Sequence, residues 1–317
     1  MTQKTLLAIG EALIDFIPEQ VGCDFGEVTS FRPAVGGAPA NVCGAFARLG
    51  GNARLLTQLG DDPFGHKIES ELSAFGIDTS CISFTNKANT SLAFVSLAKD
   101  GNRTFSFYRN PAADMLYSPR QIHREWFDNA FALHFCSVSL GDYPMRAAHE
   151  AAIQYASGAG ALISFDPNLR FPLWPDRQAL HRAVHNFLPF AHIVKISDEE
   201  LEFITGENNI ESALPQLFAG NVQLILYTCG GSGAYAFTRT SQAFSQSQQV
   251  SAMDTTGAGD GFIGSFLWQL CQDHITADAL SGLSSQQLTQ YLSFCNRFCG
   301  VSVQSYGAIA SYPTSLI

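Results

Sequence analysis

Short apolar segments alternate with longer amphipathic segments along most of this chain, and this alternation limits the possible folds. The apolar runs of strand length are 6–9, 54–59, 131–138, 161–165, 192–196 and 222–227. Segments whose apolar residues recur with helical spacing are 41–49, 64–76, 144–156, 176–188 and 198–205. Strands that alternate with helices form βαβ units. The sequence therefore predicts an α/β fold with a mostly parallel central sheet flanked by helices.

Two inserts interrupt this rhythm. The first, from Asp15 to Pro33, is predicted to contain no helix and only short β-like pieces. In the second, from Thr90 to Tyr108, two alternating segments flank Lys99–Asn102, which is typical of a hairpin turn. We expect the inserts, at about 15–34 and 90–109, to form one small antiparallel sheet, a lid beside the α/β body. Because no linker or repeat is evident, residues 1–317 are expected to form a single domain.

The composition argues against several classes of partner. Lys and Arg number 18 against 28 Asp and Glu, and the net charge of −10 lacks the electrostatic footprint of a nucleic-acid-binding protein. No apolar stretch approaches the ~18 residues that a membrane span needs. The N-terminus does not resemble a signal peptide, and several of the eight cysteines lie in apolar runs, as reduced cysteines do. We therefore expect no nucleic-acid partner, no membrane association and a cytoplasmic location.

Some familiar nucleotide and metal motifs are missing. The sequence contains no Gly-Lys dipeptide and hence no Walker A loop. It also lacks H-E-x-x-H and an intact G-x-G-x-x-G after the first predicted strand. P-loop ATPases and dinucleotide dehydrogenases are therefore disfavoured.

The segment Asp254–Phe262 reads DTTGAGDGF and runs into an apolar helical face. A glycine-rich turn that opens a helix presents free N–H groups and the positive end of the helix dipole, and both attract anions. Asp260 falls in the first helical turn. A carboxylate beside a bound phosphate is unfavourable unless it has a task, such as accepting the proton of an attacking hydroxyl. The alternative is that Asp260 only caps the helix.

A second glycine-rich turn, Val35–Asn41, opens the helix predicted for 41–49. Gly36 and Gly37 allow the backbone to approach a ligand closely. Asn41 carries both donors and an acceptor, which suits sugar hydroxyls. The alternative is a plain turn with Asn41 near the helix cap.

Together these segments resemble the two signatures of the PfkB-type carbohydrate kinases, the ribokinase-like family. The first signature is GGxxAN at 36–41, with later glycines at 50 and 60, and the second is DTTGAGD at 254–260. The resemblance extends from GEALID at 10–15 to Gly307, and FYRNPAADML at 107–116 and FDPNLR at 165–170 are most similar to fructokinases. It implies a ribokinase-like fold with a small β-sheet lid.

The resemblance also implies a role for each matched position. Asp260 corresponds to the catalytic base, and Gly257, Ala258 and Gly259 correspond to the anion hole. Sugar contacts are implied for Asp15, Gly36, Gly37, Asn41, Arg109 and Asp114. ATP contacts are implied for Asn168, Arg170, Lys195, Ser197, Thr228, Gly230, Gly233 and Asn296. The residues alone leave other interpretations open: a surface Asp15, an Arg109–Asp114 structural ion pair, a turn held by Asn168, and an exposed Lys195.

The metal sites rest on the resemblance as well. Many family members have asparagine where Ser197 stands, in an N-x-x-E motif tied to Mg²⁺ and phosphate. Ser197 cannot supply an amide, whereas Glu200 remains and is expected to order water bound to Mg²⁺. The positions matching a monovalent cation site, expected to hold K⁺, are Asp254 and Thr256, with Ser302, Gly307 and Ser311 in the loop that completes it.

The function implied is transfer of the γ-phosphoryl group of ATP to D-fructose, giving fructose 6-phosphate. Two alternatives stay open: a kinase for another small sugar, such as 2-keto-3-deoxygluconate or a riboside, and a non-catalytic sugar or nucleotide sensor. An exposed lid edge invites pairing with a second copy, so a homodimer is expected.

Overall fold

The computed structural model describes residues 4–20, 22, 25–97 and 103–315. Within them, ten strands form a main sheet in the order β14-β13-β12-β11-β10-β9-β1-β4-β5, with β6 paired to β4. Neighbouring strands are parallel except at the β14-β13-β12 edge, so the prediction of a mostly parallel sheet is confirmed. The strands are β1 (Thr5–Ile9), β4 (Asn52–Gly60), β5 (Ile77–Asp78), β6 (Ile82–Thr85), β9 (Ala130–Cys136), β10 (Leu162–Asp166), β11 (Ile193–Ser197), β12 (Leu224–Thr228), β13 (Ala234–Phe237) and β14 (Gln242–Ser245).

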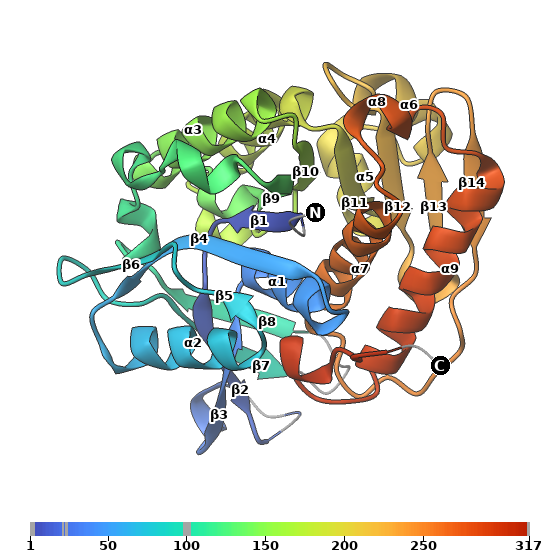
Figure 1. Ribbon diagram of the computed structural model, residues 1–317. Coiled ribbons are helices and arrows are strands. Elements are labelled where there is room, and N and C mark those ends of the chain that lie inside the picture. Colours follow the sequence, from blue (N-terminus) through green and yellow to red (C-terminus); the bar gives the residue numbers. More distant parts are fainter. Residues whose placement is uncertain (1–3, 21, 23–24, 98–102, 316–317) are drawn as a thin grey trace.

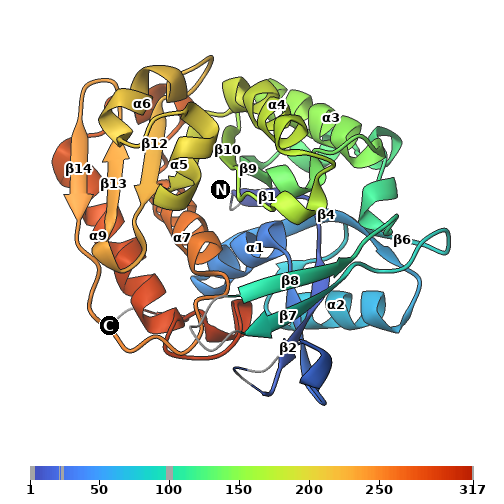
Figure 2. The ribbon, with the colours of Figure 1, turned by 180° about the vertical axis from the view of Figure 1, so that it is seen from behind.

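Helices cover both faces of this sheet (Figures 1 and 2). One face packs against α1 (Ala38–Arg48), α2 (Pro63–Ala74), α7 (Ala258–Gln272), α8 (Ala277–Leu280) and α9 (Ser285–Ser302). The other packs against α3 (Pro144–Gly158), α4 (Arg177–Phe187), α5 (Asp198–Thr205) and α6 (Ile210–Leu217). Strand β1 shows the consequence: Leu6 and Ala8 belong to the first core, and Leu7 and Ile9 to the second. Burial on both faces explains why its sequence is a continuous apolar run.

A separate small sheet is built from the two inserts, in the order β3-β2-β7-β8. Its strands are β2 (Leu13–Pro18), β3 (Phe31–Gly36), β7 (Leu92–Leu97) and β8 (Arg103–Tyr108). The prediction that it is wholly antiparallel is wrong, because its two central strands, β2 and β7, are parallel. They follow β1 and β6, which run the same way in the main sheet, so both leave the body in one direction.

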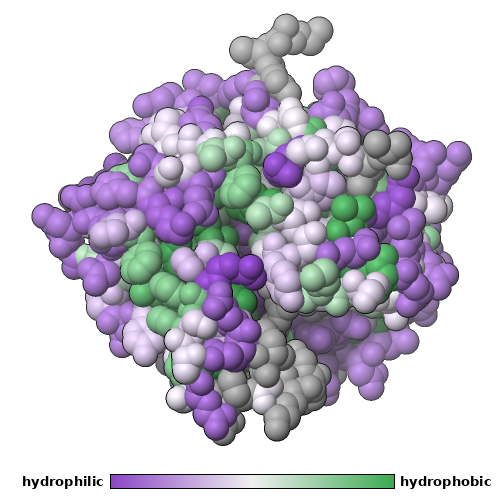
Figure 3. All heavy atoms as spheres, turned by 90° about the horizontal axis from the view of Figure 1, so that it is seen from below, coloured by the Kyte–Doolittle hydropathy of each residue, from purple (hydrophilic) through white to green (hydrophobic). Residues whose placement is uncertain are grey.

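The connection between β2 and β3 differs from the sequence expectation. The first insert contains a short 3₁₀ turn at Phe25–Glu27 where no helix was predicted. The predicted turn Lys99–Asn102 lies outside the described residues. The small sheet lies below the main sheet in Figure 1, and the face seen from that side has apolar residues near its centre and a mostly hydrophilic rim (Figure 3).

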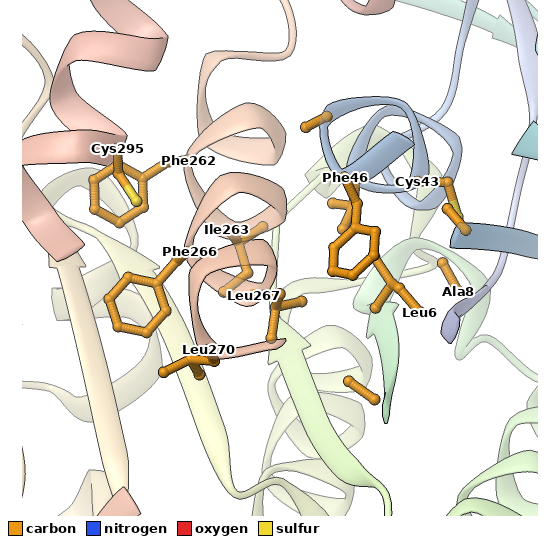
Figure 4. Packing of buried hydrophobic residues seen from close by; sticks show 14 of the residues in the cluster. Leu6, Ala8, Cys43, Phe46, Phe262, Ile263, Phe266, Leu267, Leu270 and Cys295 are labelled. Carbon is orange, nitrogen blue, oxygen red and sulfur yellow. The ribbon is translucent and has the colours of Figure 1, made fainter. Parts of the chain in front are cut away.

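Helices α1 and α7 pack closely against each other in the first core (Figure 4). The crossing requires Gly264, because a Cβ there would lie 2.7 Å from the Cβ of Ala45. Helix α1 begins at Ala38, three residues before the predicted start, with Pro39 in its first turn where proline is well tolerated. Asn41 therefore lies inside the helix and not at its cap, and it precedes Ala45 by one turn, as Asp260 precedes Gly264.

The strand order reverses direction at β1. The chain passes from β1 to β4 on one side and later places β9 on the other. In such sheets a crevice forms at the carboxyl ends of the strands beside the reversal, and ligands bind there. This edge carries the segments that follow β1, β9, β10 and β11.

Candidate active site

Two cavities meet at the N-terminal end of α7. The larger, about 690 Å³, is lined by Glu11, Asp15, Asn41, Arg109 and Asp260 among others. The smaller, about 380 Å³, is lined by Thr228, Gly230, Gly233, Asn296 and Cys299 among others. Both include the wall residues Lys195, Glu199, Thr255, Ala258 and Gly259. Two bound molecules would therefore face each other across the glycine-rich turn.

Asp260 lies at this junction and contacts helix α1. The Asn41 side chain donates a hydrogen bond from Nδ2 to Oδ2 of Asp260 over 2.8 Å. The helix N-cap is Gly257, so Asp260 is not the cap residue, contrary to the alternative drawn from sequence. Desolvation by burial raises the pKa of Asp260 to about 6, while the Asn41 hydrogen bond opposes this shift and the nearby Asp166 charge adds to it. The carboxylate is thus poised to exchange a proton near neutral pH.

The turn before α7 is held in shape by the C-terminal segment. Gly257 has φ 73°, a conformation that glycine adopts without strain. The Tyr312 hydroxyl donates to the carbonyl oxygen of Gly257 over 2.7 Å, and a Cβ at Gly257 would lie 2.5 Å from that of Ala308. The first N–H groups of α7 are therefore fixed at the junction of the cavities, where they can receive an anion.

Lys195 is buried at the junction and is not the exposed strand lysine that the sequence allowed. Its Nζ forms an ion pair with Oδ2 of Asp166 over 2.9 Å. A Cβ on Gly259 would come 3.0 Å from the same Nζ, so the ammonium group lies beside the glycine-rich turn. Although burial alone would lower it, the pKa of Lys195 is raised because the charges of Asp166 and Glu200 outweigh desolvation. The residue thus places a fixed positive charge between the two cavities.

The loop after β10 carries two of the predicted ATP contacts. Asn168 has φ 44°, and its N–H donates to Oδ1 of Asp166 over 3.2 Å, so the turn predicted as an alternative is present. Both Asn168 and Arg170 line the larger cavity. Arg170 donates from Nη1 to the carbonyl oxygen of Leu169 over 2.9 Å. These two side chains therefore lie on the larger cavity's wall and not on the smaller one's.

Ser197 and Glu200 form a capping box at the start of α5. One Glu200 oxygen accepts the N–H of Ser197 over 2.9 Å, and the other accepts the N–H of Leu169 over 2.8 Å. Glu200 thereby joins α5 to the loop after β10. Ser197 lines the smaller cavity. The carboxylate on the wall of both cavities belongs to Glu199, the residue before Glu200.

The remaining predicted ATP contacts surround the smaller cavity. Thr228 ends β12, Gly230 begins the 3₁₀ turn that follows, and Gly233 comes directly after that turn. Asn296 is buried on α9 and donates from Nδ2 to the carbonyl oxygen of Ser245 over 2.8 Å. The structure thus brings these four residues to one cavity, although they come from separate parts of the sequence.

The residues predicted to hold a monovalent cation also come together. Asp254 accepts the N–H of Thr256 over 2.9 Å through Oδ1 and the N–H of Gly307 over 2.9 Å through Oδ2. The hydroxyls of Ser302 and Ser311 lie 2.7 Å apart. The bond from Gly307 to Asp254 joins the segment after α9 to the irregular segment that leads into the glycine-rich turn, and the bond between Ser302 and Ser311 closes the residues 302–311 on themselves.

On the sugar side, Asp15 and Gly36 are diagonal neighbours on β2 and β3, where Asp15 is paired with Ala34, and a Cβ at Gly36 would overlap the Asp15 carboxylate. Asp15 and Gly37 line the larger cavity. Asp15 is therefore not a solvent-facing strand end, and the glycine lets its carboxylate approach the backbone there.

Arg109 is nearly completely buried, and its guanidinium is held entirely by protein acceptors. Its Nε and Nη2 both donate to Oδ2 of Asp114, and Nη2 also donates to the Ser139 hydroxyl over 3.2 Å. Its Nη1 donates to the Val138 carbonyl over 3.3 Å and to the Tyr143 hydroxyl over 3.4 Å. A guanidinium has five N–H groups, and all five have partners here.

Asp114 lies behind Arg109 and does not line either cavity. It is 1% exposed, and its second oxygen accepts the Ser91 hydroxyl over 2.5 Å. The expected direct sugar contact by Asp114 is therefore not supported by the structure, because both carboxylate oxygens accept hydrogen bonds from Arg109 or Ser91. The structural ion pair considered from sequence is what the residues form.

Sequence reasoning missed three functional candidates. Glu11 lines the larger cavity directly after β1, Asp166 ends β10 and pairs with Lys195, and Tyr312 holds the Gly257 turn. The position of Glu11 and Asp166 at carboxyl ends of parallel strands was a usable signal. No comparable signal exists for Tyr312, since its contact is set by packing of the C-terminal segment.

Among the described residues, no group of three or more His, Cys, Asp or Glu side chains is arranged to hold a metal ion. None of the helices in the described ranges is long and apolar enough to cross a bilayer. The seven cysteines that the structure describes carry free thiols, and Cys23 lies outside these residues.

Two adjoining cavities that share a wall at a helix N-terminus, with a carboxylate of raised pKa on the larger one, fit a group-transferring enzyme. Residues 3–315 match the pfkB family carbohydrate kinases. The chain belongs to this family and is an ATP-dependent sugar kinase with a ribokinase-like α/β fold.

Individual relatives are similar over nearly the whole chain. Fructokinase-2 of Solanum habrochaites is 41% identical over 313 residues, which cover 98% of this chain and 93% of that protein. The crystal structure of fructokinase with bound ATP from Xylella fastidiosa has a TM-score of 0.90 and 34% identity, covering 98% and 95% of the two chains. A fructokinase double mutant from Vibrio cholerae O395, in a fructose, ADP and potassium ion bound form, has a TM-score of 0.85 and 31% identity, covering 98% and 96%.

Proposed function

We propose that this enzyme transfers the γ-phosphoryl group of ATP to the 6-hydroxyl of D-fructose, giving fructose 6-phosphate and ADP. The observation that carries the proposal is the junction of the two cavities, where Asp260 and the N–H groups of α7 face the same space. The similarity to fructokinases, including one described with fructose and ADP bound, supports the choice of sugar.

In the proposed mechanism, Asp260 accepts the hydroxyl proton as the sugar oxygen forms its bond to the γ-phosphorus and the bond to the ADP oxygen breaks. The N–H groups at Gly257 and Gly259 stabilise charge on the transferring group, together with that of Ala258, which also donates to the Thr255 carbonyl oxygen over 3.2 Å. Lys195 neutralises phosphate charge from the side shared by both cavities. Asn41 holds the Asp260 carboxylate and offers its remaining polar atoms to the sugar. Most of the rate then comes from positioning and electrostatics.

ATP is proposed to occupy the smaller cavity, with Ser197, Thr228, Gly230, Gly233 and Asn296 along it. Magnesium normally binds through one or two carboxylates together with substrate phosphates, so it does not need a cage of side chains. The acidic start of α5 fits this need, with Glu199 on the cavity wall and Glu200 in the capping box beside it. When bound, Mg²⁺ would neutralise charge on the phosphates.

A monovalent cation, K⁺, is proposed to bind where the segment of Asp254 and Thr256 meets the loop of Ser302, Gly307 and Ser311. It would act by fixing the glycine-rich turn. The expected result is a higher rate in K⁺ than in a bulky tetraalkylammonium salt at equal ionic strength. Equal rates, with contaminating K⁺ excluded, would remove the cation from the proposal.

The whole of residues 1–317 is proposed to act as one catalytic domain, in which the small sheet is a lid. Phe105 and Phe107 of β8 line the larger cavity, so the small sheet contributes directly to its wall. Closure would exclude water, which competes with the sugar as acceptor. The edges of the small sheet, β3 and β8, are the surfaces proposed to pair in a homodimer, which light scattering in solution would test. A cytoplasmic location is proposed from the sequence alone.

The side of the larger cavity around Arg109 favours a neutral sugar over the acidic alternative, 2-keto-3-deoxygluconate. Glu11, Asp15 and Asp260 line this cavity, and the N–H groups of Arg109 are committed to protein acceptors. A sugar carboxylate beside Arg109 would therefore meet negative charges and no free N–H of that arginine. The other two cations on this wall, Arg170 and Lys195, are the ones that the family resemblance assigns to the phosphates of ATP. Ribosides are neutral and are not separated from fructose by this argument.

The test is an ADP-release assay with a panel of sugars. D-fructose is expected to give the highest kcat/KM among common monosaccharides. If 2-keto-3-deoxygluconate or a riboside is converted tenfold better, a difference of about 1.4 kcal/mol in transition-state stabilisation, the substrate assignment is wrong. Sugar and nucleotide binding without turnover of any sugar would instead support the sensor alternative.

A further inference from the structure

Glu11 is a buried carboxylate on the wall of the larger cavity with no part in the mechanism above. It follows Gly10 at the carboxyl end of β1, beside the point where the strand order reverses. The residue is 2% exposed and shares the cavity wall with Asp15, Asn41 and Asp260. A buried charge is costly unless it is paired or used, so its presence here needs an explanation.

The protein supplies two hydrogen bonds to this carboxylate. The N–H of Ala38, in the first turn of α1, donates to Oε1 over 3.3 Å. The Ser139 hydroxyl donates to Oε2 over 2.8 Å. An ionised carboxylate has about four acceptor positions, so these bonds leave acceptor capacity for a ligand hydroxyl in the cavity.

The positive charge of Arg109 partly offsets the effect of burial on Glu11. Burial raises the pKa of Glu11, Arg109 opposes this shift, and the negative charge of Asp114 adds to it. A carboxyl group in either protonation state retains an oxygen that can accept a hydrogen bond. The two side chains share Ser139, whose oxygen accepts from Arg109 and whose hydroxyl donates to Glu11. Because Arg109 has no uncommitted N–H, it supports Glu11 electrostatically and cannot take the ligand itself.

We propose that Glu11 is a specificity-determining residue, which accepts a hydrogen bond from a hydroxyl of the neutral sugar other than the reacting one. The inference rests on the proposed function, since it assumes that the sugar occupies the larger cavity. A purely structural role, tying α1 to the loop after β9, would need acceptors but would not need a carboxylate aimed into the cavity. The two roles differ in what they predict for altered sugars.

The experiment combines Glu11→Gln with fructose analogues in which one hydroxyl at a time, other than that at C6, is removed or methylated. The glutamine keeps the size and an acceptor for Ala38 but loses the charge. Each enzyme and sugar pair is assayed for kcat/KM at saturating ATP. The matched control is Glu125→Gln, the same change at a surface position away from both cavities.

For D-fructose we expect Glu11→Gln to lower kcat/KM at least tenfold, mainly through a higher KM for the sugar with the KM for ATP unchanged. One analogue should lose at least tenfold with the wild-type enzyme and lose little more with the variant, because the same hydrogen bond is already missing. Additive losses for every analogue would overturn the proposal, as would a fructose kcat/KM within twofold of wild type.

A second variant keeps the test decisive if the glutamine form does not fold. Glu11→Asp retains the charge but shortens the side chain by one methylene. One analogue is again expected to lose little further kcat/KM with this variant, because the same hydrogen bond is already weakened. Equal losses of kcat/KM for all analogues would count against the proposal. If the wild-type enzyme releases no ADP with fructose, the proposed function fails. If it does and the losses are additive, only the role of Glu11 fails.

Discussion

Two buried ion pairs lie on opposite sides of the same site, and they differ in what they leave free. Arg109 and Asp114 form a closed pair, in which every guanidinium N–H has a protein acceptor and Asp114 lies behind the cavity wall. Lys195 and Asp166 form an open pair, in which the ammonium group lies beside Gly259 and lines both cavities. The Arg109–Asp114 pair supports the wall of the cavity, and the Lys195–Asp166 pair presents a positive charge to a ligand.

The difference follows from side-chain chemistry. A guanidinium is a planar fork whose donors can all be satisfied by fixed acceptors, whereas an ammonium is a compact charge on a flexible stem. A buried pair is not by itself a sign of stability. The two pairs differ in whether the cation keeps a hydrogen-bond donor or a charge that a molecule in the cavity can contact. The following predictions test this contrast, beginning with the carboxylate that lies between the two pairs.

The largest effect is expected for Asp260→Asn. The amide keeps the size of the side chain but cannot accept the sugar proton, so kcat should fall by at least ~10². Nucleotide affinity should hold or increase, since a negative charge beside the phosphates is removed. Measuring kcat and ATP binding on this variant tests the role; a loss of less than about tenfold would mean that Asp260 is not the base.

The same variant has a stability readout with a defined sign. The pKa of Asp260 in the folded protein is raised from 3.8 to about 6, so ionisation of this group costs stability as pH rises through that window. Removing the charge at pH 7 should therefore leave the melting temperature equal or higher. A lower melting temperature would show that the carboxylate mainly supports the fold.

Arg109→Met tests the closed pair. Removing the cation leaves Asp114 buried without its partner, and the free energy of unfolding should fall by about 3–5 kcal/mol. The control is Arg54→Met, which breaks the partly exposed pair with Asp78 and should cost no more than about 1 kcal/mol. Urea unfolding of both variants gives the comparison, and equal losses would contradict the distinction between them.

The open pair predicts a different outcome. Lys195→Met should weaken ATP binding and lower kcat even when Asp166→Asn is added to relieve the unpaired carboxylate. For the closed pair, Asp114→Asn added to Arg109→Met should recover part of the lost stability. Recovery of activity in the Lys195 and Asp166 double variant would show that this pair, too, is only structural.

The pH dependence of kcat/KM for the sugar measures the base in the free enzyme. Because Asp260 must be ionised to accept a proton and its pKa lies at about 6, kcat/KM should fall roughly tenfold per pH unit below that value and level off above it. A profile that is flat between pH 5 and 8 would be inconsistent with this assignment. The acid limb should be absent in Asp260→Asn.

The smallest effect is expected for Asn41→Ala. The Asn41 hydrogen bond lowers the pKa of Asp260, so its removal should move the acid limb upward by roughly one pH unit. The position of the acid limb in the kcat/KM profile measures this effect, whereas weaker sugar binding lowers kcat/KM equally at every pH. An unmoved limb would mean that Asn41 serves the sugar alone.

Sequence patterns predicted most central strands of the fold and, within the site, the glycine-rich turn that begins α7. The apolar runs marked most central strands, because parallel strands are buried on both faces, and the glycine-rich turn marked the start of α7 at Gly257. These features are local, so a short window of sequence contains their cause. The antiparallel edge at β13–β14 and the parallel β2–β7 contact were missed, because strand direction depends on where distant segments enter the sheet.

The side-chain networks were less accessible from sequence. The Arg109–Asp114 pair was foreseen as an alternative because its members are five residues apart, but the commitment of every donor involves Val138, Ser139 and Tyr143. The contact of Asn41 with Asp260 spans 219 positions and depends on the close crossing of two helices at Gly264. Such contacts follow from packing and have no signature in spacing.

The bond from Tyr312 to Gly257 has a consequence for the order in which activity arises during synthesis. The glycine-rich turn is complete in sequence by residue 260, yet the groups that fix its shape, at Gly307, Ala308 and Tyr312, are translated after every proposed catalytic residue. A nascent chain still tethered at residue 300 would contain every proposed catalytic side chain but not the support for the anion-binding turn. We therefore expect catalytic competence only once residues 302–312 have been translated and have docked against the turn.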